Sequence, residues 1–119
     1  MDNKEFAKQL KIRTKKFAIS IIRLSTSLPH TPEGNVVRNQ ITKSGTSVGA
    51  NYREANRSRS KADFTNKIKI CESEASETSY WLEIIKEIEW SDIKSLQLIL
   101  KESNEILAIF TSVATKLKL

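Results

Sequence analysis

The chain has 119 residues, with 20 Lys and Arg against 14 Asp and Glu and a formal charge of +6 at pH 7. This length suits one domain, and 39% hydrophobic with 29% charged residues is typical of a globular protein and not of a disordered one. No apolar run approaches the ~18 residues of a membrane span, no signal-peptide core is present, and the lone Cys71 excludes an internal disulfide. We therefore expect a single cytoplasmic domain over residues 1–119 that does not associate with membranes.

Apolar residues recur at helical spacing near the start of the chain and predict a helix over about residues 3–28. The stripe expected to face the core consists of Phe6, Leu10, Phe17, Ile21, Leu24 and Leu28. Thr31 is a good N-cap, Pro32 suits a first helical position, and Glu33 favours the positive end of a helix. A second helix is therefore expected from about Pro32 to Arg57.

The inner stripe of this second helix is predicted to contain Val37, Ile41, Ser44, Val48, Asn51 and Ala55. Gly45 and Gly49 stand one turn apart beside the stripe. Each glycine weakens a helix by about 1 kcal/mol relative to alanine. We therefore expect another helix to approach closely at this point.

A third helix is predicted from a cap at Ser60, with Asp63 in the position of a capping box, to about Trp90. Its stripe consists of Phe64, Ile68, Cys71, Ala75, Thr78, Leu82 and Ile85. Ser91 as a cap and Asp92 as a first-turn acid start a fourth helix to about Leu117. The fourth stripe consists of Ile93, Leu96, Leu100, Leu107, Phe110 and Ala114. Four long helices with short connections predict an all-α protein, an antiparallel up-down-up-down four-helix bundle.

Catalytic constellations are hard to build from this sequence. A Cys71–His30 pair is disfavoured, because the predicted helices place His30 in a turn at the bundle end far from Cys71. Carboxylate-bridged metal sites in bundles need Glu-x-x-His motifs on two helices, and the one histidine lies in that turn. We expect no enzymatic activity, no catalytic residues, no metal and no cofactor.

Several polar residues fall within the predicted apolar faces. Glu74 and Glu77 lie in the wide apolar arc of the third helix, and Arg13 interrupts the first stripe at a similar height. A buried carboxylate without a partner is costly, so a buried or half-buried network that fixes helix register is expected. This structural network comprises Arg13, Asn51, Glu54, Glu74 and Glu77. In the alternative interpretation, one of the glutamates lines a groove that binds a partner.

The charges are distributed unevenly along the chain. Residues 1–61 hold 13 Lys and Arg against 4 Asp and Glu, whereas residues 62–119 hold 7 against 10. This asymmetry can guide a polyanion to one face, or it can let the two halves attract each other. The candidate phosphate-binding residues are Arg53, Arg57, Arg59 and Lys61, together with Lys15 and Lys16. A solvated, basic turn is the alternative, since cations are favourable at a helix C-terminus.

Apolar residues also remain outside the inner stripes. Ile12 and Ile19 lie on the back of the first helix, and Leu98 and Ile109 on the back of the fourth. Together with the ridge of Gly45 and Gly49, they predict a second buried surface, because exposed apolar patches usually mark an interface. We therefore expect a homo-oligomer.

Three strings carry a family resemblance: Ser44-Gly-Thr-Ser-Val-Gly-Ala-Asn-Tyr-Arg-Glu-Ala55, Ser60-Lys-Ala-Asp-Phe64 and Glu74-Ala-Ser-Glu-Thr-Ser-Tyr-Trp-Leu82. They resemble the bacterial four helix bundle proteins, a family that includes proteins encoded by intervening sequences in large-subunit ribosomal RNA genes. Accessory proteins of diversity-generating retroelements are related to it. The resemblance implies a left-handed antiparallel bundle that assembles as a homopentameric ring. For the retroelement proteins it also implies a basic surface that contacts nucleic acid and a reverse transcriptase.

Asn51, Glu54, Glu74 and Glu77 match the motif positions of this family, and no catalytic role attaches to them. Ala55 stands where many relatives have glycine, so the second helix is expected to continue beyond it. Two hypotheses follow: an accessory protein that binds RNA or DNA through phosphates, or a structural adaptor that binds another protein. Because the sequence lacks an exposed series of aromatic residues, any nucleic-acid binding is expected to be directed at the backbone.

Overall fold

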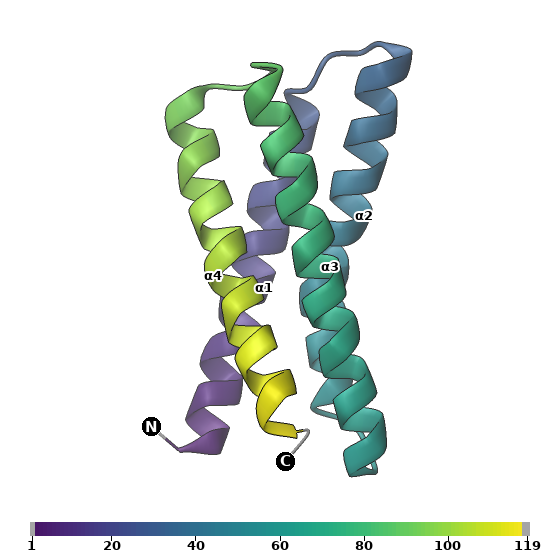
Figure 1. Cartoon of the computed structure of the whole chain (residues 1–119), viewed down its shortest axis with the longest axis vertical. Coiled ribbons are helices and arrows are strands. Elements are labelled where there is room, and N and C mark those ends of the chain that lie inside the picture. The colour runs from purple at the N-terminus through teal and green to yellow at the C-terminus, as the bar shows by residue number, and fades with distance from the viewer. Residues whose placement is uncertain (1, 118–119) are drawn as a thin grey trace.

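Four α-helices make up the part of the chain described by the computed structural model, residues 2–117 (Figure 1). They are α1 (Asn3–Thr26), α2 (Pro32–Ala55), α3 (Lys61–Glu87) and α4 (Ile93–Leu117). Consecutive helices run in opposite directions, so the α1–α2 and α3–α4 turns lie at one end and the α2–α3 turn at the other (Figure 1). Residues 2–117 contain no strand, and the predicted all-α, antiparallel four-helix bundle is confirmed.

The helices begin where polar side chains cap them. Thr31 and Ser60 each accept a hydrogen bond from the backbone N–H three residues later, at 3.0 and 3.1 Å, as the sequence predicts. At the start of α4 the cap is Asp92 and not Ser91, because Oδ2 of Asp92 accepts the equivalent bond at 3.1 Å. These bonds satisfy backbone donors that have no partner inside the helix.

Three of the helices end earlier than predicted: α1 at Thr26, α2 at Ala55 and α3 at Glu87. Past each end some N–H groups bond to carbonyls three residues back, among them those of Ser27, Arg57 and Glu89, and these bonds tighten the last turn. Glu89 then adopts a φ of 58°, in the left-handed region that a right-handed helix cannot contain. Because α2 ends at Ala55, the expectation that this helix continues beyond Ala55 is wrong.

The core is formed by apolar side chains from all four helices. Most of the predicted stripes are buried, among them Leu10, Ile21, Ile41, Val48, Ile68, Leu82, Leu96 and Phe110. Phe6 and Ile93 lie near helix ends and are exposed, contrary to prediction. On α4 it is Ile106, and not Leu107, that is fully buried. Tyr52 of α2 is also buried, with its ring edge-on to Phe110 at 5.5 Å between centroids.

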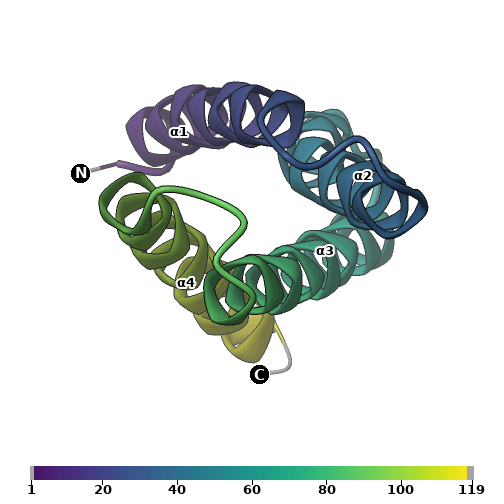
Figure 2. The ribbon, with the colours of Figure 1, turned by 90° about the horizontal axis from the view of Figure 1, so that it is seen from above.

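The four helices do not pack equally against one another. Viewed along the bundle, they form a four-sided arrangement in which α1 lies between α2 and α4 (Figure 2). The α1–α2, α2–α3 and α3–α4 pairs pack closely, whereas α1 and α4 contact each other much less. We call this loosely packed junction the α1–α4 seam.

Gly45 and Gly49 are the points at which α2 approaches α1. A methyl group at position 45 would lie 2.7 Å from Cγ2 of Ile21, and one at position 49 would lie 3.3 Å from the backbone carbonyl carbon of Thr14. The predicted close approach is therefore confirmed, and the neighbouring helix belongs to the same chain. Gly45 is buried within this contact, so the expectation that it forms part of a surface between subunits is wrong.

We expect Gly45→Ala to destabilise the bundle although alanine is the better helix former. The added methyl would overlap the fully buried Ile21, and such overpacking costs about 1–3 kcal/mol. Gly49→Ala is the matched control, because it brings the same gain in helix propensity and meets Thr14 at 3.2–3.3 Å, which a shift of a few tenths of an ångström relieves. The free energy of unfolding of this control should stay within about 1 kcal/mol of the wild-type value. Urea unfolding checks both variants, and equal effects would contradict the packing described here.

Candidate nucleic-acid interface

The α2–α3 turn presents the predicted basic cluster to solvent. Arg53 lies in the last turn of α2, Arg57 and Arg59 lie in the connection, and Lys61 is the first residue of α3. All four side chains belong to exposed residues. None of them takes part in an ion pair within residues 2–117. Their charges are therefore available to an anionic partner.

The structure separates the two lysines that were predicted to join this cluster. Lys15 lines a groove between α1 and α2 together with Arg53. Lys16 is also exposed, but it follows Arg13 by three residues and so lies on the side of α1 towards α4. Lys11, one turn before Lys15, lines the groove instead. Lys11 precedes Lys15 by four residues, and this helical spacing could have predicted that the two lysines share a face of α1.

We call the surface formed by Lys11, Lys15, Arg53, Arg57, Arg59 and Lys61 the basic face. It extends from the α1–α2 groove to the α2–α3 turn. Lys11 and Lys15, like the turn residues, have no ion-pair partner within residues 2–117. The positive potential of neighbouring cations adds up along a groove, which favours the approach of a polyanion.

Other basic residues of the first half serve the fold. Arg38 donates hydrogen bonds to the carbonyl oxygens of Ser25, Leu28 and Pro29, at 3.0, 2.5 and 3.0 Å. These bonds satisfy acceptors at the end of α1 and in the turn that follows. Arg38 is thus half-buried and forms no part of the basic face.

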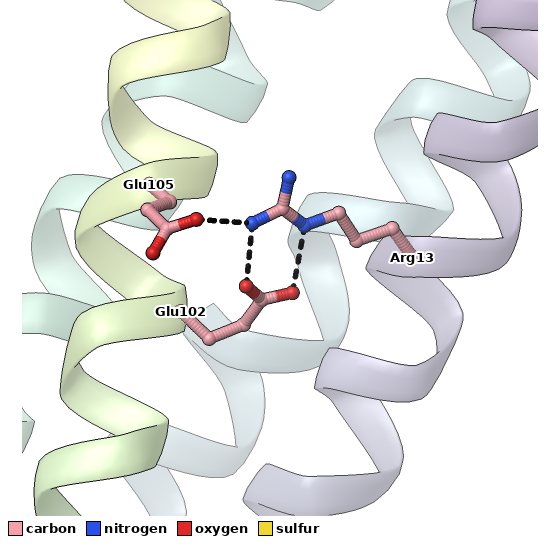
Figure 3. Close-up of polar contacts among 3 residues, drawn as sticks. All are labelled: Arg13, Glu102 and Glu105. Atoms are coloured by element: carbon pink, nitrogen blue, oxygen red, sulfur yellow. Dashed lines mark hydrogen bonds and ion pairs between the residues drawn. The ribbon is translucent and has the colours of Figure 1, made fainter.

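Arg13 bridges the α1–α4 seam. Its Nε and one terminal nitrogen donate to the two carboxylate oxygens of Glu102 at 2.8 and 2.6 Å, and the same nitrogen reaches Glu105 at 3.0 Å (Figure 3). The hydrogen bond to Glu102 contributes most to raising the pKa of Arg13, and burial opposes it. Because Arg13 points towards α4, its predicted network with the glutamates of α2 and α3 is wrong.

The remaining members of the predicted polar network do not form one cluster. Asn51 is half-buried and donates to the carbonyl of Ser47 at 2.8 Å, and the exposed Glu54 lines the α1–α2 groove. Glu77 is exposed and accepts a hydrogen bond from the indole nitrogen of Trp81 at 3.1 Å. These side chains therefore form separate contacts and do not make up one network that fixes the register of the helices.

Glu74 of α3 has a raised pKa. It is half-buried, and burial raises the pKa of its carboxyl above the ordinary 4.5, with a smaller rise from neighbouring Glu77 and an opposing effect of Lys43. The folded state therefore holds the proton of Glu74 more tightly than the unfolded state does. As pH rises above the ordinary pKa, ionisation of Glu74 costs the folded state part of its stability.

Cys71 and His30 do not form a catalytic pair. Cys71 is buried, and its Sγ donates to the carbonyl of Val48 at 3.5 Å. Burial raises the pKa of the thiol to about 12, which keeps it protonated and unreactive at neutral pH. His30 lies exposed in the turn between α1 and α2. Within residues 2–117, no group of three or more His, Cys, Asp and Glu side chains is arranged to hold a metal ion.

The predicted apolar back of the bundle is exposed on both sides of the α1–α4 seam. Ile12 and Ile19 of α1 are 48% and 39% exposed, Leu98 of α4 is 71% exposed, and Ile109 is half-buried. A second group, whose exposure was not predicted from the sequence, lies on α2, on α3 and at the C-cap of α3. It contains Val36, Tyr80 and Ile88, all exposed, and the half-buried Trp81.

This arrangement of four antiparallel helices around one core defines an all-α helical-bundle protein. The family model described as "23S rRNA-intervening sequence protein" matches residues 5–112, and the chain belongs to this family. A similar solved structure comes from Bacteroides thetaiotaomicron and is described as a protein of unknown function from the S23 ribosomal protein family. It is 38% identical, the match covers 88% of this chain and 97% of that one, and the TM-score is 0.81.

No curated protein matches the chain. Among the described residues, no helix is long and apolar enough to cross a membrane.

Proposed function

We propose that this protein is a non-enzymatic, oligomeric, cytoplasmic accessory factor that binds RNA or DNA through phosphate contacts on its basic face. The observation that carries the proposal is the set of exposed cations that have no acidic partner within the described residues. A protein that only needed its basic half to attract its acidic half would place these cations against carboxylates. One such pairing is present, because Arg13 of the basic half pairs with Glu102 and Glu105 of the acidic half, but it lies outside the basic face.

The binding expected from such a surface is electrostatic. Lysine and arginine side chains neutralise phosphates and release counterions, so affinity falls steeply with salt and depends little on sequence. The family description refers to the intervening sequence of 23S rRNA, which makes RNA a natural first probe. The resemblance to retroelement accessory proteins adds a reverse transcriptase as a candidate protein partner.

The exposed apolar residues support assembly of several copies. Viewed along the bundle, the α1–α4 seam and the α2–α3 side lie on opposite sides (Figure 2). Both sides carry exposed apolar residues, and the two sets differ. Two different patches on opposite sides favour head-to-tail contact, which can close into a ring, and the resemblance implies a pentamer. Such a ring would leave the α1–α2 side of each copy uncovered.

Several copies of the basic face would strengthen binding. One subunit contacts few phosphates and binds weakly, whereas linked copies engage one polyanion together. The affinity can then rise by orders of magnitude without any base-specific contact. The competing function is an adaptor that binds another protein through its exposed apolar side chains, and such an adaptor would bind no nucleic acid even at low salt.

Replacing Arg57 and Arg59 with Ala should weaken binding to all nucleic-acid sequences alike. For each phosphate that the variant no longer neutralises, the logarithmic salt slope on duplex DNA should flatten by roughly 0.9. Exposed turn residues contribute within about 0.5 kcal/mol to stability, so the fold should survive. Lys94→Ala with Lys101→Ala is the matched control, since it removes the same charge from exposed positions of α4.

Fluorescence anisotropy over a salt series measures the binding of both variants. If both variants weaken binding to the same extent, net charge and not the basic face carries the binding.

Replacing Ile12 and Ile19 with Glu should dissociate the assembly into monomers. Both side chains are exposed in the single chain, so the variant should keep the helical circular-dichroism signal of the wild type. A carboxylate buried between subunits without a partner is costly, which disfavours association. Light scattering at micromolar concentration checks the mass of both proteins. A monomeric wild type, or an unchanged mass in the variant, would refute this interface.

A further inference from the structure

The α1–α2 groove has a floor of small side chains and a rim of charged ones. Ala18, Gly49 and Ala50, with Thr46, form the floor, and Lys11, Lys15, Arg53 and Glu54 form the remainder of the lining. The groove has a volume of about 380 Å³. This lies within the range of ~300–1,000 Å³ that is usual for sites that hold a small molecule. Gly49 lets the backbones of α1 and α2 approach at Thr14 beneath this floor.

The groove contains charged side chains of both signs, which favours a ligand more complex than a simple anion. Three cations, Lys11, Lys15 and Arg53, would attract phosphate. Glu54 lies among them, is exposed, and has no ion-pair partner within residues 2–117. A carboxylate only accepts hydrogen bonds, so it would repel a ligand made of phosphate alone. The groove therefore suits a ligand that carries phosphate beside a hydrogen-bond donor.

We propose that this groove holds one unstacked base of a single-stranded nucleic acid, with the flanking phosphates on Lys11, Lys15 and Arg53 and an exocyclic amino group of the base on Glu54. The proposal rests on the proposed function and adds to it a strand type and a base preference. Bases of single strands are free to leave the stack and lie in a protein groove. A duplex keeps its bases paired inside, and it can reach the basic face only through its backbone.

The nature of the floor decides which part of the nucleic acid it receives. The methyl groups of the floor offer no hydrogen bonds to a phosphate, and the Thr46 hydroxyl already donates to the carbonyl of Thr42 at 2.7 Å. The flat, weakly polar face of a base packs well against such a floor. Cytosine carries an amino group where uracil carries a carbonyl oxygen, and carboxylate side chains accept hydrogen bonds from that amino group. Cytosine should therefore be preferred over uracil at this position.

Ala50→Leu tests the groove itself. Ala50 is an exposed helical residue, so leucine should be tolerated while its side chain fills the floor. Ala108→Leu is the control, since it makes the same change at an exposed position of α4. We expect Ala50→Leu to weaken binding of twelve-nucleotide single-stranded oligodeoxycytidine by about tenfold, equivalent to ~1.4 kcal/mol. Binding of a twelve-base-pair duplex should change less than about twofold, and the control should change neither.

Glu54→Gln tests the base preference. An amide can accept from cytosine and can also donate to uracil, so the variant should bind oligodeoxycytidine and oligodeoxyuridine equally. The wild type should prefer oligodeoxycytidine. If Ala50→Leu binds the single strand as well as the wild type does, or weakens duplex binding to the same extent, the groove proposal is wrong. The same holds if the wild type shows no preference between the two oligonucleotides.

The two proposals fail in different ways. If replacing Arg57 and Arg59 weakens binding while Ala50→Leu and Glu54→Gln have no effect, the groove proposal is wrong and the proposed function stands. If the wild-type protein binds neither single strands nor duplex at low salt, both are wrong.

Discussion

The close approach of α1 and α2 is the contact on which the rest of this structure depends. Gly45 admits the side chain of Ile21, and Gly49 admits the backbone at Thr14. This contact sets Lys11 and Lys15 beside Arg53 across a groove, so cations from distant parts of the sequence form one surface. A bulkier residue at position 45 would overlap Ile21, push the helices apart and separate these charges.

The opposite side of α1 is packed in another way. There the contact with α4 is sparse, and Arg13 bridges the gap to Glu102 and Glu105. Since these side chains are about one-third to one-half exposed, water screens the ion pairs, and they orient the helices more than they stabilise them. Apolar residues of α1 and α4 are exposed on this side, where the proposed assembly would place another subunit, whereas the basic face lies on the α1–α2 side.

The local features of the fold could be predicted from the sequence, whereas its pairings between helices could not. Thr31 and Ser60 mark helix starts because a cap acts within three residues. The partners of Arg13 could not be derived, because periodicity shows which residues share a face but not which helix lies opposite that face. For the same reason, the sequence could not show that Lys15 lies in the groove and Lys16 does not. Nor could it show the buried hydroxyl contact between Ser79 and Ser103, at 2.7 Å, which joins α3 to α4.

Lysine footprinting tests most directly whether nucleic acid binds on the α1–α2 side. The protein would be acetylated with and without RNA at low salt, and the modified lysines quantified by mass spectrometry. We predict that RNA protects Lys11, Lys15 and Lys61, that high salt removes this protection, and that Lys94 and Lys101 are acetylated equally in both samples. Protection centred on Lys94 and Lys101, or none at any lysine, would contradict the account.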